Sequence, residues 1–471
     1  MKPYPGVAQL VARQLWELEA ASSSLATRTN KKTAVRRFFI KTLGSADMDR
    51  KIYNAYVSLL RSELTMATGC TEPIAIAYAG AKLREVLGAI PERCTVYCSG
   101  NIVKNVMAVT VPNSGGAKGI DTAAVLGMVG GDASQVLDVL HAITPEHIAL
   151  MRTLVESGMC RTELVEDVAN LYIRMEAVAG AESALVEIVD YHSNITRIER
   201  NGEVLLRAGE SSEESAEEPD KSLLNMRDIL RFAEEVALED VSAVLENQLE
   251  CNSRICEEGL ANPWGAEVGR TILEGDDGHT LSNRACAFAA AGSDARMNGC
   301  PLPVVINSGS GNQGIAVSMP LLIYAREYAV PHEKLLRALA LANLTALHQK
   351  RFIGSLSAYC GATSAATASA CGIAWMLGGD YDVVCGVITN SINTIGGMIC
   401  DGAKSSCASK IATATNMALL ALNMSRKGRV LKPGEGLVED DIEQTIASVG
   451  RMGCIGMKCT DVEILKIMLG Q

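Results

Sequence analysis

The stretch GESSEESAEEPDKS, residues 209–222, divides a chain of 471 residues into two parts of different character. Its acidic and serine residues bury little apolar surface, so it is predicted to be a solvated acidic linker. The sequence before it mixes helical with β-branched patterns, whereas almost everything after it has helical periodicity. This change predicts an α+β protein, with a mixed α/β domain over 48–208 and a mainly α-helical domain over 223–471.

The mixed part carries its strand signals in two places. Residues 94–116 contain β-branched runs that end in a proline and glycine cluster, and residues 184–209 contain further strands. The pair Asn201-Gly202 predicts a hairpin turn between the last two of these strands. Helical patterns are expected between the two places, at about 134–178.

Charge and hydropathy exclude several classes of partner. The formal net charge is −11, and no basic block is longer than a pair such as Lys31-Lys32 or Arg36-Arg37, so neither nucleic acid nor an anionic membrane is expected to bind. No stretch reaches the roughly 18 uninterrupted apolar residues that span a bilayer, and the N-terminus lacks the pattern of a signal peptide. The protein is therefore expected to be cytoplasmic.

Fifteen cysteines are spread along the chain without the dense spacing of a disulfide-rich secreted domain, and the cytosol would keep them reduced. Most are expected only to pack in the core, as Cys371 and Cys385 would within their apolar segments. There is no CxxC pair, and the six histidines have no zinc-binding spacing. A zinc site is therefore not expected.

Residues 1–47 differ from the rest and resemble the conceptual translation of a transfer-RNA gene, whereas Met48 has the surroundings of a natural start. They are predicted to be a non-native or disordered N-terminal extension. The alternative is a real amphipathic helix, because Leu10, Leu15 and Leu18 have helical spacing. We expect a chain that starts at Met48 to fold and act as the full chain does.

Three cysteines stand just ahead of predicted helices. Cys70 is followed by Glu72 and Pro73, which are typical of a helix start, and Cys360 and Cys407 each precede a run of small residues. A helix N-terminus carries partial positive charge, so it is expected to lower the pKa of each thiol. The thiolate is the form that binds iron or takes a proton.

Spacing limits which thiols could meet. A helix from Cys360 would place Cys371 about 16 Å away, so Cys371 is assigned to the core. Cys400 and Cys407 would lie about 10 Å apart in a helix, so a shared site needs a folded loop, which the intervening Gly402 can supply. Spacing alone also fits the alternative that these thiols are unrelated.

Five unusual motifs occur together: MATGCTEPIAIAYA (66–79), CSGNIVKNVMAVTVPNSGGAKGI (98–120), NSGSGNQGI (307–315), YCGATSA (359–365) and GGMICDGAKSSCASK (396–410). With them, residues 48–471 resemble the L-cysteine desulfidase family, which is related to the iron–sulfur L-serine dehydratases. The resemblance implies a [4Fe-4S] cluster held by Cys360, Cys400 and Cys407. It also implies that the helix after Cys70 faces the active site and that Cys70 is the catalytic base. An alternative makes Cys70 a cluster ligand in place of Cys407.

The activity that the resemblance implies is β-elimination of L-cysteine to pyruvate, ammonia and sulfide, with an open iron of the cluster as Lewis acid. An iron–sulfur L-serine dehydratase is the first alternative, because hydroxide could leave from the same iron. A non-catalytic iron–sulfur sensor is the second. The preference between L-cysteine and L-serine, and the assembly of the chain into a homo-oligomer, are left open by the sequence.

Four polar residues have two interpretations each. Asn312 lies in a Gly-rich stretch that is either a plain turn or an anion nest for the substrate carboxylate. Lys104 either binds that carboxylate or is a solvated surface lysine, which is the simpler interpretation. Lys404 either binds substrate or balances thiolate charge. Glu72 is most simply a first-turn charge on the helix dipole rather than a catalytic acid.

Overall fold

The computed structural model describes residues 48–207, 220–354 and 356–471. Residues 50–471 form a compact unit, and the account below concerns this unit. The predicted N-terminal extension and nearly all of the predicted acidic linker lie outside the described residues. Within the described part, no helix is long and apolar enough to cross a membrane.

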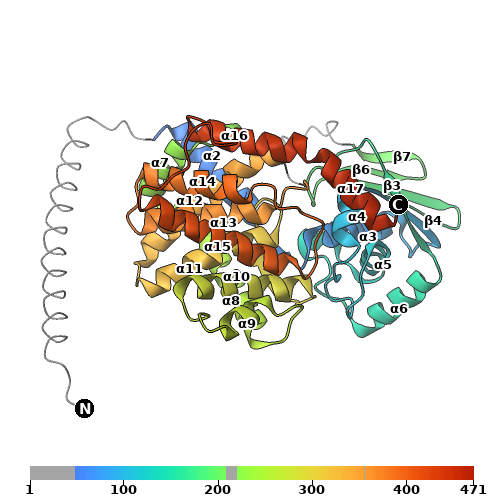
Figure 1. Ribbon diagram of the computed structural model, residues 1–471. Helices are drawn as coiled ribbons and strands as arrows, with labels where there is room; N and C mark the ends of the chain where they lie inside the picture. The colour runs from blue at the N-terminus through green and yellow to red at the C-terminus, as the bar shows by residue number, and fades with distance from the viewer. Residues whose placement is uncertain (1–47, 208–219, 355) are drawn as a thin grey trace, which may run out of the picture. The chain divides into compact units, whose positions relative to one another are not determined.

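A six-stranded sheet, in the order β3-β2-β4-β5-β6-β7, forms the first part of this unit (Figure 1). Only the pair β2–β3 is parallel; the other neighbouring pairs are antiparallel. The strands are β2 (Arg93–Ser99), β3 (Cys160–Val165), β4 (Tyr172–Ala179), β5 (Glu182–Val189), β6 (Ile195–Arg200) and β7 (Glu203–Arg207). The helices of this part are α3 (Thr71–Leu87), α4 (Gly100–Val106), α5 (Ile120–Gly130) and α6 (Pro145–Glu156), with a 3₁₀ helix at Ala133–Asp138.

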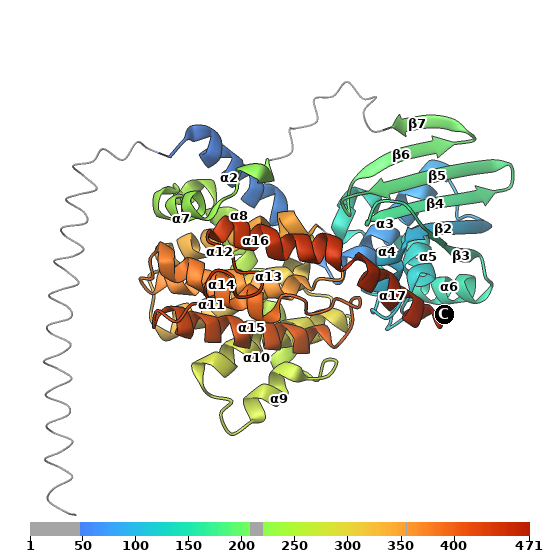
Figure 2. The same cartoon turned by 45° about the horizontal axis from the view of Figure 1, so that its top comes forward.

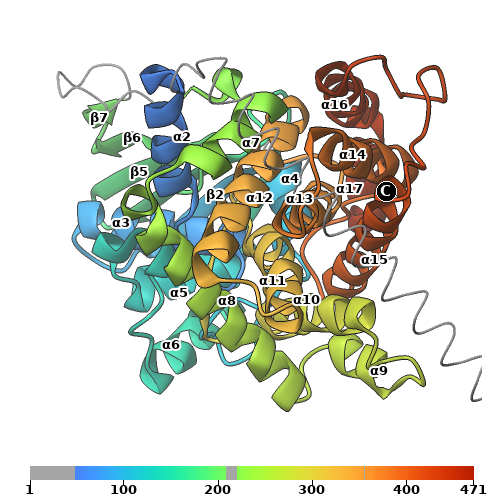
Figure 3. The same cartoon turned by 90° about the vertical axis from the view of Figure 1, so that its left-hand side faces the viewer.

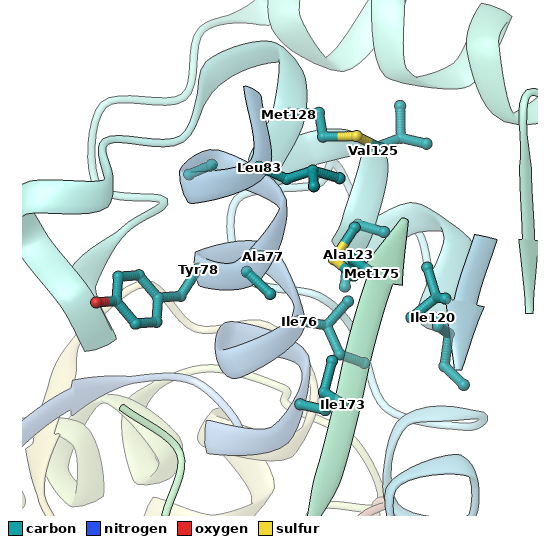
Figure 4. Close-up of a cluster of buried hydrophobic side chains, with 14 of the residues drawn as sticks. Ile76, Ala77, Tyr78, Leu83, Ile120, Ala123, Val125, Met128, Ile173 and Met175 are labelled. Atoms are coloured by element: carbon teal, nitrogen blue, oxygen red, sulfur yellow. The ribbon is translucent and has the colours of Figure 1, made fainter. Parts of the chain in front are cut away.

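One face of the sheet packs against α3 and α5 to form a buried core. Figure 4 shows Ile76 and Ala77 of α3 beside Ile173 and Met175 of β4. All four side chains are fully buried, because α3 is apolar on nearly every side and the strands alternate buried with half-buried residues. This core fixes the start of α3, and with it the position of Cys70.

The hairpin prediction is confirmed: β6 and β7 are joined at Asn201-Gly202, which have φ of 52° and 83°. Two other predictions are wrong. Residues 100–106 form helix α4 rather than a strand, and 160–179 contain β3 and β4 inside the region expected to be helical. The strand β4 was missed because its apolar residues alternate with charged residues on the open face of the sheet, so the segment does not have a continuous β-branched run. Pairing with the neighbouring strands decides its structure.

The rest of the chain is almost entirely helical, as predicted, and the α+β class is confirmed. Helix α13 lies among α11, α12, α14 and α15 (Figure 3), where alanine, serine and threonine allow close packing. The helices are α7 (Met226–Glu235), α8 (Ser242–Ala261), α9 (Val268–Glu274), α10 (Leu281–Met297), α11 (Gly311–Glu327), α12 (His332–Ile353), α13 (Gly361–Met376), α14 (Tyr381–Ile395), α15 (Cys407–Ser425), α16 (Ile442–Arg451) and α17 (Lys458–Leu469).

The first and last helices of the unit 50–471 each pack against the opposite part. Helix α2 (Arg50–Glu63) contacts α7 and α12, and strand β1 (Met66–Thr68) pairs with β8 (Pro303–Val305). At the other end, α17 leaves the helical part and packs on α4 (Figure 2). The predicted domain boundaries remain a prediction, and contacts cross them in both directions.

We expect Gly127→Ala to destabilise the fold, because a Cβ there would overlap the carbonyl oxygen of Ala77 where α5 meets α3. Overpacking of this kind costs about 1–3 kcal/mol. Gly275→Ala is the matched control, since its Cβ would lie 3.5 Å from the nearest atom, the carbonyl oxygen of Ile272. Denaturant unfolding of both variants measures the difference; equal stabilities would contradict the close helix contact.

Candidate functional site

Cys360 and Cys400 lie side by side on two short antiparallel segments. Cys360 is the N-cap of α13, as predicted, and Cys400 lies in the loop that connects α14 to α15. The backbone N–H of Cys360 donates to the carbonyl of Met398 (2.9 Å), and that of Cys400 donates to the carbonyl of Ala358 (2.6 Å). Their thiols also hydrogen-bond to each other. The backbone pairing therefore sets the distance between these two sulfur atoms.

Cys407 and Cys70 complete a group of four cysteines. Cys407 is the first residue of α15, and its Sγ lies 3.7 Å from the carbonyl oxygen of Gly402 within the folded loop that its spacing predicts. Cys70, the N-cap of α3, packs with Cys407 on a small apolar cluster that includes Met297. Cys371 is fully buried in α13, which confirms its packing role.

The expectation that a helix N-terminus lowers the thiol pKa is wrong for all three cysteines to which it applied, Cys70, Cys360 and Cys407. Burial and the charge of a neighbouring carboxylate raise the pKa of Cys70, burial raises that of Cys407, and the hydrogen bond with Cys400 together with burial raises that of Cys360. Only Cys400 has a lowered pKa, about 6, because Cys360 donates to it and Lys104 lies nearby. For the three thiols at helix starts, the removal of sulfur from water raises the pKa more than the helix dipole lowers it.

Lysine side chains surround these thiols. Lys350, buried in α12, has its pKa lowered to about 8 by burial, while the charges of Cys400 and Cys360 act in the opposite direction. Lys410 of α15 pairs with Asp401 and donates to a backbone carbonyl of the same loop (2.9 Å). The site is therefore electropositive and suits an anionic group.

The predicted substrate-binding residues have different surroundings. Lys104 is 1% exposed and pairs with Asp461 of α17, so the interpretation as a surface lysine is wrong. Lys404 Nζ lies 2.8 Å from Asp401 Oδ1, which makes charge balance its simpler role. Asn312 lies in the first turn of α11, and its Oδ1 is buried without a hydrogen-bond partner.

Glu72 is the functional candidate that the sequence undervalued. Its carboxylate, in a side chain 8% exposed, accepts hydrogen bonds from Cys70 Sγ (2.9 Å) and Asn105 Nδ2 (3.0 Å), and Thr71 Oγ1 lies 3.3 Å away. Burial raises the pKa of Glu72, but the neighbouring His192, the hydrogen bond from Cys70 Sγ and the charge of Arg296 together lower the pKa further than burial raises it. An acidic residue two positions after Cys70, followed by the apolar run of residues 73–81, was the available signal.

The Gly-rich stretch 307–314 lies between two of the four cysteines. Thr71 Oγ1 donates to the carbonyl of Gly309 (2.9 Å), which joins the stretch to the start of α3. At its other end, the side-chain amide of Gln313 packs against Gly361, the residue after Cys360. A Cβ on Gly361 would overlap this amide. The anion-nest function of this stretch remains a prediction.

No group of three or more histidine, cysteine, aspartate or glutamate side chains in the described ranges is arranged around a single metal ion. A separate hollow of about 560 Å³ lies over the sheet, lined by β2, β4, β5 and their neighbours. None of the four cysteines lines this hollow, so it is separate from the candidate site.

A family model described as "Serine dehydratase alpha chain" matches residues 134–466. The chain belongs to the serine dehydratase alpha chain family. It is also 44% identical to a UPF0597 protein of Treponema denticola over 428 residues, which are 90% of this chain and 99% of that protein. UPF0597 proteins of Lachnoclostridium phytofermentans and Finegoldia magna are 46% and 45% identical, over 89% and 88% of this chain and 100% and 99% of their own lengths.

Membership of this family indicates that the protein is a lyase-like enzyme. The matched residues include Cys360, Cys400 and Cys407, whereas Cys70 and Glu72 lie before the match begins. The relatives match over nearly their whole length. Their match therefore includes both the segment that contains Cys70 and Glu72 and the segment that contains the other three cysteines.

We expect Gly402→Ala to disrupt the loop between Cys400 and Cys407. Gly402 has φ +95°, and a Cβ would overlap the carbonyl oxygen of Lys104. Gly397→Ala is the control, because it has φ +113° with no atom within 4 Å of its Cβ position. The backbone strain of about 1–2 kcal/mol is then common to both, and the overlap adds about 1–3 kcal/mol to Gly402→Ala alone. Thermal unfolding of both variants measures this difference, and equal losses would contradict the contact.

Proposed function

We propose that this protein is an iron–sulfur L-cysteine desulfidase, which eliminates sulfide from L-cysteine and yields pyruvate and ammonia. The observation that carries the proposal is the meeting of Cys360, Cys400 and Cys407 with the Cys70–Glu72 pair at one place. The ligand cysteines supply the donor set of a [4Fe-4S] cluster, and the pair supplies a proton acceptor beside it.

The three proposed ligands fit a cluster better than a single metal ion. In a four-iron cluster each thiolate binds a different iron, so the sulfur atoms need not converge on one point. Cys360, Cys400 and Cys407 interact with one another, so three sulfur donors lie within one small region. The lysines around them, Lys104, Lys350 and Lys410 among them, offset the negative charge of three thiolates.

When bound, a cluster with three thiolate ligands supplies an open iron that acts as a Lewis acid toward the leaving group. Cys400 and Cys407 would hold it from the folded loop, and Cys360 from the start of α13. Asn101 and Asn105 of α4 add buried side-chain oxygens without hydrogen-bond partners to the same region.

Cys70 and Glu72 provide the proton chemistry. The resting proton lies on Cys70 Sγ, because burial and the charge of Glu72 both raise its pKa. For Cys70 to take the α-proton of the substrate, this proton first moves to Glu72 Oε2 along the 2.9 Å hydrogen bond, a transfer that runs against the lowered pKa of Glu72 and the raised pKa of Cys70. Asn105 holds the carboxylate in place through Oε1. Glu72 is thus proposed to position and activate Cys70.

An iron–sulfur L-serine dehydratase is the second candidate, favoured by the description of the matching family model. The same residues would act, with hydroxide as the leaving group. A non-catalytic iron–sulfur sensor has no need of the Cys70–Glu72 pair, whose burial and hydrogen bonds therefore argue against it.

Alanine variants of the cysteines separate ligand from base. We expect Cys360→Ala, Cys400→Ala and Cys407→Ala each to lose bound iron and turnover together, because too few thiolates remain. Cys70→Ala should keep the iron and the visible absorption of the cluster while turnover falls by roughly 10²–10⁴. Anaerobic purification with iron analysis and pyruvate detection measures both quantities.

Cys371→Ala is the control, since this buried thiol lies outside the group and should keep both iron and turnover. Loss of iron in Cys70→Ala, with iron retained in Cys407→Ala, would reverse the assignment of base and ligand. Full turnover in Cys70→Ala would exclude Cys70 as the base.

A further inference from the structure

Arg296, near the end of α10, is a buried cation whose Nε and Nη2 donors lack an acceptor. It is 2% exposed. None of the ion pairs within the described residues involves it. Burial of a guanidinium costs several kcal/mol unless an anion and its hydrogen bonds compensate. The charge of Glu72 acts on Arg296, but Nε and Nη2 of the guanidinium still lack an acceptor, which an anionic ligand would supply.

The guanidinium lies at the start of α11. A Cβ on Gly311, the first residue of that helix, would lie 2.8 Å from Arg296 Cζ and closer still to Nε. A side chain at this position would overlap the guanidinium and Val304, so glycine leaves room for Arg296 against this turn. The charge of Arg296 also acts on Cys70 and Glu72, and its neighbour Met297 packs against Cys70. This places Arg296 beside the proposed base.

The first turn of α11 adds further donors at the same point. This helix is 17 residues long, and no side chain caps its N-terminus, so its first N–H groups have no cap acceptor. Besides the two Arg296 atoms, His192 Nε2 is buried here without a partner, as are two amide oxygens, Asn312 Oδ1 and Gln313 Oε1, which are acceptors and do not bind a carboxylate themselves. Backbone N–H groups, the helix dipole and a guanidinium together form a site for a carboxylate.

We propose that Arg296 and the N-terminus of α11 bind the α-carboxylate of the amino-acid substrate. The inference rests on the proposed function for the identity of the substrate, and it replaces Lys104 and Lys404 in that role. Those two lysines already pair with Asp461 and Asp401. A carboxylate held at Arg296 lies next to Cys70, so the α-carbon attached to it comes within reach of the base.

The carboxylate site can be tested by binding alone, with two thiols that are not substrates. They are 3-mercaptopropionate and its neutral amide, 3-mercaptopropionamide, which differ only in the carboxylate. Titration calorimetry on the cluster-loaded full chain under anaerobic conditions gives both dissociation constants. We expect the unmodified protein to bind the acid about 10² times more tightly than the amide, since charged hydrogen bonds are lost with the amide. Equal affinities would overturn the proposal whatever the variants show.

Variants at Arg296 give the second comparison. Arg296→Gln should weaken binding of the acid by about 10² while binding of the amide stays the same, and Arg296→Lys should fall between. Arg284→Gln on the same helix is the control, because that arginine pairs with Glu327 and should leave both affinities unchanged. A purely structural role for Arg296 would instead lower both affinities and the iron content together, which would contradict the proposal.

The outcomes for the site and for the reaction are separable. Selective binding of the acid by a protein that forms no pyruvate would support the carboxylate site and reject the desulfidase activity. Pyruvate formation from L-cysteine with an unchanged KM in Arg296→Gln would support the activity and overturn the role of Arg296. If Arg296→Gln fails to fold, Arg296→Lys and the two ligands on the unmodified protein still decide the question.

Discussion

The contact between Gly402 and the carbonyl of Lys104 holds the proposed site together. It joins the loop that carries Cys400 and Cys407, from the helical part, to α4, from the part that contains the sheet. Lys104 then reaches Asp461 of α17, so the last helix packs on the same element. Because β1 also pairs with β8, residues that lie hundreds of positions apart are fixed relative to one another. The meeting of the cysteines depends on this junction.

The electrostatics of the site follow from burial more than from helix dipoles. Three of the four thiols have raised pKa values although each begins a helix, because removing sulfur from water disfavours the thiolate. Positive charge comes instead from lysines on α4, α12 and α15 and from Arg296 on α10. A buried cationic site favours an anionic cluster and an anionic substrate.

The sequence predicted what local chemistry determines. The helix after Cys70, the hairpin at Asn201-Gly202 and the folded loop at Gly402 follow from capping, turn and glycine preferences. The sequence did not predict features that depend on residues far away in the chain. Lys104, for example, is buried with an ion pair to Asp461, which lies in the last helix, α17. Arg296 could not be found from its surroundings in sequence, since its position against Gly311 arises from the packing of two helices.

Pyruvate and sulfide formation by the anaerobically purified protein, measured against its iron content with L-cysteine and L-serine as substrates, tests the central claim most directly. The account predicts equal amounts of pyruvate and sulfide from L-cysteine, at a rate that rises with bound iron and is absent from iron-free protein. Faster pyruvate release from L-serine would identify a dehydratase. Turnover of L-cysteine at the same rate by iron-free protein, or none by the iron-loaded protein with either substrate, would contradict the account.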